Sequence, residues 1–240
     1  MLSKSQIKLI TRLKQKKYRV AEGFFVAEGI KVINELLNST LKLHHLFTTE
    51  TFNINKNETL ITQAELKKIS FLTTPNKALA VFKIPEAVKV DTKGLIVALD
   101  DVRDPGNLGT IIRLCDWYGI ANLVCSIGTV DCYNPKVIQA TMGSITRVNI
   151  SYLNLSDFLK QNNKTLILGA FMDGENVYKT KLPNSGILVM GNEANGISKT
   201  IEEQVTKRIA IPRFGTIQAT ESLNVATATA ILLSEFKRNA

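Results

Sequence analysis

The sequence predicts an α/β protein in which a larger C-terminal domain, built on a parallel sheet, follows a smaller α/β domain. Short apolar runs and amphipathic stretches alternate along most of the 240 residues, and this alternation is typical of parallel strands covered by helices. Residues 84–93 interrupt it with Pro85 and several charged side chains, and proline excludes a central strand. We therefore expect a linker there, and domains at residues 1–88 and 93–240.

The first domain is expected to begin with an amphipathic helix over residues 3–17. Basic side chains at helical spacing form a stripe on one face, at Lys4, Lys8, Arg12, Lys16 and Arg19. Such a stripe fits either contact with an RNA backbone or an ordinary solvated face. Thr62 and Glu65 have the spacing of a capping box, which starts another helix. The other predicted elements are helices at residues 29–37 and 62–69 and strands at residues 24–27, 45–48 and 79–83.

The second domain is expected to alternate strands and helices throughout. Its predicted strands are residues 95–100, 122–126, 147–152, 165–171, 186–190 and 208–211. Its predicted helices are residues 107–118, 135–143, 156–161, 198–204 and 222–237. Polar or glycine-rich loops follow the strands 95–100, 186–190 and 208–211. Because ligands bind outside the carboxyl ends of the strands in open α/β sheets, we expect the site among these loops.

The positive charge is concentrated in the first domain. The formal net charge is +9, and residues 1–92 hold 15 Lys and Arg against 8 Asp and Glu. Residues 93–240 hold 15 against 13, and residues 1–20 contain seven basic residues and no acidic one. A basic end on a nearly neutral body indicates a polyanionic partner, with a simply solvated surface as the alternative.

Several classes of protein are excluded by composition. No apolar run reaches the length of about 18 residues that crosses a membrane, and the N-terminus lacks an apolar signal region. Cys115, Cys125 and Cys132 have no metal-binding spacing, so we expect neither a disulfide framework nor a zinc site, and a cytoplasmic location. The only histidines, His44 and His45, lie in the first domain, which excludes a histidine-based catalytic set in the second.

Three loop segments of the second domain together resemble the motifs of SpoU/TrmH-type RNA ribose 2′-O-methyltransferases, in the SPOUT superfamily. The matching residues are Asn107, Gly109 and Arg113 in the first, Gly191, Glu193 and Gly196 in the second, and Ile211, Pro212 and Ser222 to Val225 in the third. The resemblance covers residues 93–240. Ala226 departs from it, since many members have serine there.

This resemblance implies a trefoil-knotted parallel-sheet fold and S-adenosyl-L-methionine as the cofactor, with no metal. It also implies a structured RNA substrate, ribosomal RNA being favoured over transfer RNA, and a homodimer through the C-terminal domain. Apolar residues of the last helix are expected to meet the partner, namely Leu223, Val225, Ile231, Leu232 and Phe236. The first domain resembles the RNA-binding domain that many such enzymes carry. The alternative is a catalytically silent RNA-binding or assembly factor with the same fold.

The resemblance assigns catalysis to Arg113, Asn107 and Glu193. Arg113 is held to act in the family, in some accounts as the general base. Because arginine keeps its proton, we favour a role in binding a phosphate and stabilising the developing oxyanion. Asn107 is expected to be the N-cap of its helix, where a phosphate can dock. Glu193 is expected to orient Arg113 or to help remove the hydroxyl proton.

Cofactor contacts are expected in the second and third motif segments. The residues concerned are Met190, Gly191, Asn192, Ile211, Pro212, Ser222, Leu223 and Asn224. Glycine at 191 permits close approach of the backbone, and Leu223 is suited to pack on an adenine ring. Ser222 and Asn224 are supporting residues that cap the last helix or contact the substrate.

Overall fold

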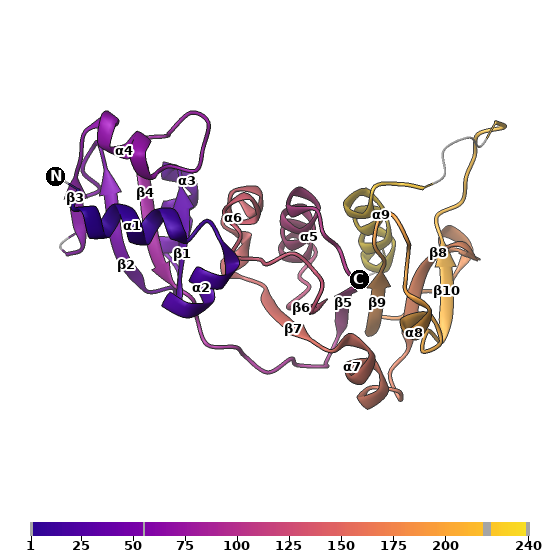
Figure 1. Ribbon diagram of the computed structural model, residues 1–240. Coiled ribbons are helices and arrows are strands. Elements are labelled where there is room, and N and C mark those ends of the chain that lie inside the picture. Colours follow the sequence, from indigo (N-terminus) through magenta and orange to yellow (C-terminus); the bar gives the residue numbers. More distant parts are fainter. Residues whose placement is uncertain (1, 55, 218–221, 239–240) are drawn as a thin grey trace. The chain divides into compact units, whose positions relative to one another are not determined.

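The computed structural model describes residues 2–54, 56–217 and 222–238 (Figure 1). Contacts divide the chain into two compact units. The first consists of residues 1–87 and 131–146, and the second of residues 88–130 and 147–240. The change of unit at residue 87 falls inside the expected linker. Residues 131–146 also belong to the first unit. A division of the chain at a single linker does not predict this.

The first unit is a four-stranded sheet with helices on both faces. The strand order is β1 (Phe24–Glu28), β4 (Ala78–Lys83), β2 (Leu43–Thr48) and β3 (Glu58–Leu60). β4 is antiparallel to both of its neighbours, and β2 is parallel to β3. Alternate residues of the strands belong to two core clusters, one on each face. One cluster includes residues of α3 (Ile30–Leu37), and the other includes residues of α1 (Lys4–Arg12) and α4 (Gln63–Ile69).

The N-terminal helix differs from its prediction over residues 3–17. It ends at Arg12, and a second helix, α2 (Lys16–Glu22), follows. Ser3 and Gln6 form a capping box at the start of α1. The capping box predicted at Thr62 is confirmed at the start of α4. The split removes Arg19 from the basic stripe, because its side chain is only 2% exposed. The short strand β3 was also not predicted.

The segment 131–146 completes the first unit. It contains α6 (Pro135–Thr141) and a 3₁₀ turn, η1 (Ser144–Thr146). Ile138 of α6 joins the same core cluster as Phe25 of β1. Arg19 reaches Asp131 at the start of this segment with an Nη2–Oδ2 distance of 2.6 Å. This ion pair, in which Arg19 is buried and Asp131 is 14% exposed, and the apolar contacts together hold the segment in place.

The second unit is a parallel six-stranded sheet, as predicted. The order is β10 (Lys207–Ala210), β8 (Ile167–Asn176), β9 (Gly186–Met190), β5 (Leu95–Leu99), β6 (Asn122–Ser126) and β7 (Asn149–Leu153). All neighbouring pairs are parallel. Every residue of β5 and β9 is buried, because these central strands are covered on both faces.

Helices cover both faces of this sheet (Figure 1). α5 (Pro105–Trp117) and α9 (Val225–Lys237) pack against each other on one face. α7 (Leu155–Gln161) and α8 (Lys199–Glu202) pack against each other on the other, and a 3₁₀ turn, η2 (Val177–Lys179), follows β8. The knot depends on the path of residues 218–221, which lie outside the described residues, so it stays a prediction.

Candidate active site

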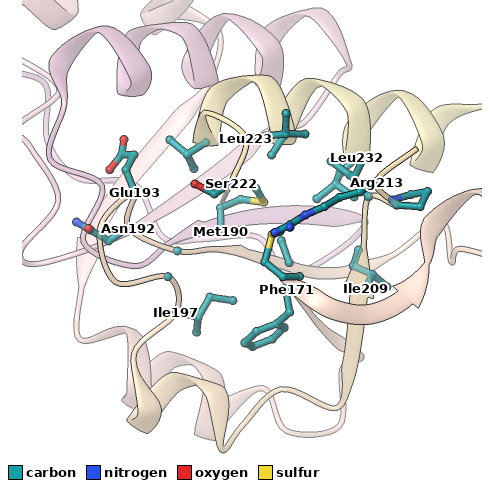
Figure 2. A pocket seen from close by; sticks show the side chains of 18 of the residues that line it. Phe171, Met190, Asn192, Glu193, Ile197, Ile209, Arg213, Ser222, Leu223 and Leu232 are labelled. Atoms are coloured by element: carbon teal, nitrogen blue, oxygen red, sulfur yellow. The ribbon is translucent and has the colours of Figure 1, made fainter. Parts of the chain in front are cut away.

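A cavity of about 820 Å³ lies beyond the carboxyl ends of β9 and β10 and reaches the start of α9 (Figure 2). Figure 2 shows Phe171 and Ile197 on one side of it and Leu223 and Leu232 on the other. Its size is within the range of small-molecule sites, about 300–1,000 Å³. The predicted cofactor residues line it with the exception of Asn224, at Met190, Gly191, Asn192, Ile211, Pro212, Ser222 and Leu223.

The loop after β9 is built on direct contact between backbones. A Cβ on Gly191 would lie 2.2 Å from the carbonyl carbon of Gly196, so no other residue fits without moving the loop. Asn192 and Gly196 exchange two backbone hydrogen bonds, of 2.9 and 2.8 Å. The Asn192 amide also donates to the carbonyl oxygen of Asp101 at 2.5 Å. This side chain therefore holds the loop in place.

Asn107 is not the N-cap of α5, contrary to the prediction. Asp104 caps the helix, because its Oδ1 accepts from the Asn107 backbone N–H at 2.8 Å, and Pro105 begins the helix. The Asn107 side chain is thus available for longer-range contacts. Its Nδ2 donates to Glu193 Oε1 at 2.6 Å, and its Oδ1 accepts from Asn224 Nδ2 at 2.8 Å. One residue from each of the three motif segments takes part in this chain of hydrogen bonds.

Asn224 is the N-cap of α9, so the predicted helix start at Ser222 is wrong by three residues. Its Oδ1 accepts from the backbone N–H groups of Ala226 at 3.0 Å and Thr227 at 3.2 Å. Capping by Asn224 leaves Ser222 and Leu223 in the loop before the helix, where both line the cavity. Leu223 is 47% exposed, as a side chain at a cavity wall can be.

Arg113 is not among the described residues that line the cavity. It is exposed on α5 in line with Thr110 and Trp117, which we call the α5 face, and Trp117 is 83% exposed. Glu193 is bonded to Asn107, and among the described residues no ion pair joins it to Arg113. The predicted orientation of Arg113 by Glu193 is therefore not seen within one chain.

Phe171 and Arg213 are among the residues that line the cavity and that sequence reasoning missed. Arg213 follows Pro212 of the third segment directly, and this adjacency was an available signal. Phe171 gave none, since it stands at the end of a predicted strand. The guanidinium carbon of Arg208 lies 3.6 Å from the centroid of the Phe171 ring. Arg208 also holds Asp173, and this hydrogen bond lowers the pKa of the Asp173 carboxyl.

The residues present fit S-adenosyl-L-methionine. Apolar side chains face each other across the cavity, as a flat adenine ring requires, and Glu193 brings a carboxylate to a ligand that carries a positive sulfonium. No cluster of metal-ligating side chains was found within the part of the chain that the structure describes. None of the described helices is long and apolar enough to span a membrane.

A parallel α/β sheet with a cavity beyond its strand ends, joined to a small α/β domain, is the architecture of a two-domain ligand-binding protein. More specifically, the chain belongs to the SpoU rRNA methylase family, whose model matches residues 94–234. Residues 4–80 match the MRM3-like substrate binding domain. The family predicted from the three segments is thereby confirmed.

The similarity to individual relatives extends over at least 92% of the chain. The 23S rRNA (guanosine(2553)-2'-O)-methyltransferase RlmP of Bacillus subtilis is 30% identical over 231 residues, which cover 92% of each chain. A TrmH-family protein from Porphyromonas gingivalis is 38% identical, with a TM-score of 0.91 and coverage of 100% of both chains. An AdoMet-bound rRNA methyltransferase from Sinorhizobium meliloti is 28% identical, with a TM-score of 0.86 over 99% of this chain and 97% of that one.

Proposed function

We propose that this protein methylates a ribose 2′-hydroxyl of ribosomal RNA with S-adenosyl-L-methionine as the donor. The single observation that carries the proposal is the Glu193–Asn107–Asn224 chain of hydrogen bonds, which joins all three motif segments beside the cavity. The family and the similarity to the 23S rRNA 2'-O-methyltransferase of B. subtilis support ribosomal RNA over transfer RNA. A catalytically silent assembly factor would have no need to keep this arrangement.

Three side chains carry the chemistry in this proposal. When bound, the cofactor supplies a methyl group already activated on its sulfonium, so the protein has to position the ribose and assist loss of a proton. Among the described residues that line the cavity, Glu193 alone has a carboxylate, and it accepts the hydroxyl proton. Asn107 fixes the orientation of that carboxylate. Arg113 binds a phosphate next to the ribose and stabilises the developing oxyanion.

A homodimer accounts for the absence of Arg113 from the described lining of its own chain's cavity. Of the apolar residues first expected at the interface, Val225, Leu232 and Phe236 are at most 5% exposed within one chain, whereas Leu223 is 47% exposed. The α5 face offers an exposed tryptophan beside Arg113. We expect Trp117→Arg to give a monomer by sedimentation and to lose methyl transfer. A dimer of unchanged stability in this variant would remove the α5 face from the interface.

The N-terminal unit is proposed to bind RNA through α1. Lys4, Lys8 and Arg12 are exposed along it, whereas Ile10 and Leu13 are at most 1% exposed. Deleting the first helices would therefore damage the core, and substitution is the better test. Neutralising the three basic residues to Gln should lower the slope of log affinity against log salt by roughly 2–3. An unchanged slope would place the RNA elsewhere.

The decisive experiment uses labelled S-adenosyl-L-methionine and total RNA from cells that lack the gene. RNA is separated by size, digested and analysed for 2′-O-methyl nucleosides. We expect label in ribosomal RNA, no label with Arg113→Ala, and unchanged cofactor binding by that variant in calorimetry. Label in transfer RNA would correct the substrate. Cofactor-independent RNA binding with no labelled product from any RNA would favour the silent assembly factor.

A further inference from the structure

One wall of the cavity comes from an irregularity in β8. The ladder between β8 and β10 pairs Gly169 with Arg208, and the next residue, Ile209, pairs with Glu175. Residues 170–174 therefore bulge out of the ladder. Ala170, Phe171 and Met172 of this bulge line the cavity, so the shape of the cavity depends on how the bulge is held.

Arg208 holds the bulge from the opposite strand. Its guanidinium carbon lies 3.6 Å from the centroid of the Phe171 ring. The same guanidinium donates to Asp173 Oδ1 at 2.5 Å and forms a second ion pair with Glu202 of α8. Two carboxylates on one planar group restrict its rotation, and a stacked guanidinium then limits the rotamers of the aromatic ring.

Glycines on both sides of the bulge leave room for this arrangement. A Cβ on Gly169 would lie 2.4 Å from an edge carbon of the Phe171 ring. A Cβ on Gly174 would lie 2.5 Å from the backbone of Ile209. The Phe171 ring therefore lies between Gly169 of β8, the guanidinium of Arg208 and the cavity. Figure 2 shows the ring on the opposite side of the cavity from Leu223.

We propose that Arg208 is a positioning residue for the cofactor: it holds Phe171 as the floor of the cavity, and affinity for S-adenosyl-L-methionine depends on this stack. The inference rests on the proposed function only in taking the cavity as the cofactor site. A cavity wall that is already ordered binds the cofactor more tightly, because the Phe171 side chain then loses less conformational freedom on binding. Arg208 is not among the described residues that line the cavity, so we expect the rate of methyl transfer at saturating cofactor to be unaffected.

The test is calorimetric titration of the full-length protein with S-adenosyl-L-methionine and with S-adenosylhomocysteine, without RNA. We expect Arg208→Met and Phe171→Leu each to raise Kd about tenfold. The double variant should be no weaker than Phe171→Leu alone, because Arg208 acts through the ring. Arg208→Lys should lie between Met and the parent, since lysine keeps the charge but not the planar stack.

A matched control is Lys207→Met. Lys207 is the neighbouring residue of β10 and pairs with Glu175 at 3.0 Å, so the change removes an equal charge and an ion pair without the aromatic contact. Its Kd should equal that of the parent. At saturating cofactor, kcat of Arg208→Met should stay within about twofold of the parent.

Additive effects in the double variant, or an unchanged Kd in Arg208→Met, would overturn the proposal. If Arg208→Met fails to fold, Gly169→Ala serves instead, because it displaces the ring without altering Arg208, and an unchanged Kd there has the same meaning. Binding is measured without RNA, so a protein that binds the cofactor but methylates nothing refutes the proposed function and leaves this inference standing.

Discussion

Replacing Asn107 by Asp tests whether the hydrogen-bond chain beside the cavity serves catalysis. The change keeps the shape of the side chain and its acceptor for Asn224. It replaces the Nδ2 donor, 2.6 Å from Glu193 Oε1, with a carboxylate oxygen. A hydrogen bond to a charged group contributes about 1.5–3 kcal/mol. Two like charges about 4 Å apart repel by about 1 kcal/mol in water.

The pair is solvent-exposed, so the lower ends of these ranges apply and the arrangement loses about 2–3 kcal/mol. We expect kcat/KM of Asn107→Asp to fall about 30- to 150-fold at pH 7. Methyl transfer to ribosomal RNA is the assay, and the melting temperature shows whether the fold survives. Asn184→Asp is the control, because it adds the same charge at an exposed loop residue of the second unit. Equal activity of both variants would refute the catalytic role of the chain.

Three further predictions concern the cavity and the cores. Gly191→Ala forces the loop to move and should weaken cofactor binding more than tenfold in calorimetry. An affinity equal to that of the parent would contradict the steric argument. Burial raises the pKa of the Cys115 thiol to about 12. It stays protonated at pH 8, so iodoacetamide should label it only after unfolding, as mass spectrometry of peptides will show. Arg19→Met removes the ion-pair partner of Asp131 and should lower the free energy of unfolding by about 3–5 kcal/mol in denaturant titration. A loss below about 1 kcal/mol would mean that the pair is replaceable.

The sequence predicted the sheet of the second unit well because its strands are buried on both faces and appear as uninterrupted apolar runs. It predicted which loops form the site because ligands bind beyond the carboxyl ends of parallel strands, and these loops follow such ends. It failed at Asn107, since Asp104 and Pro105 form an equally good helix start three residues earlier. The first helix was predicted too long because the break after Arg12 allows Arg19 to turn inward to Asp131, a residue far along the chain.

Contacts between distant segments explain what sequence reasoning missed. The hydrogen bond between Asn107 and Asn224 joins residues 117 positions apart. The bulge that carries Phe171 is defined by a register shift between β8 and β10. No residue pattern within β8 predicts it. Prediction from residue patterns therefore located the candidate site, but the way its parts are held together came from the structure.

The first unit is discontinuous in sequence, and this limits how the protein can be divided. A protease that cut within residues 84–93 would leave a fragment without α6, whose Ile138 completes the core beside Phe25. Such a fragment would expose an apolar sheet face and lose the partner of Arg19. A shortened gene that ended at this linker would encode an aggregation-prone product. An intact first unit needs the residues on both sides of β5, α5 and β6 in the sequence.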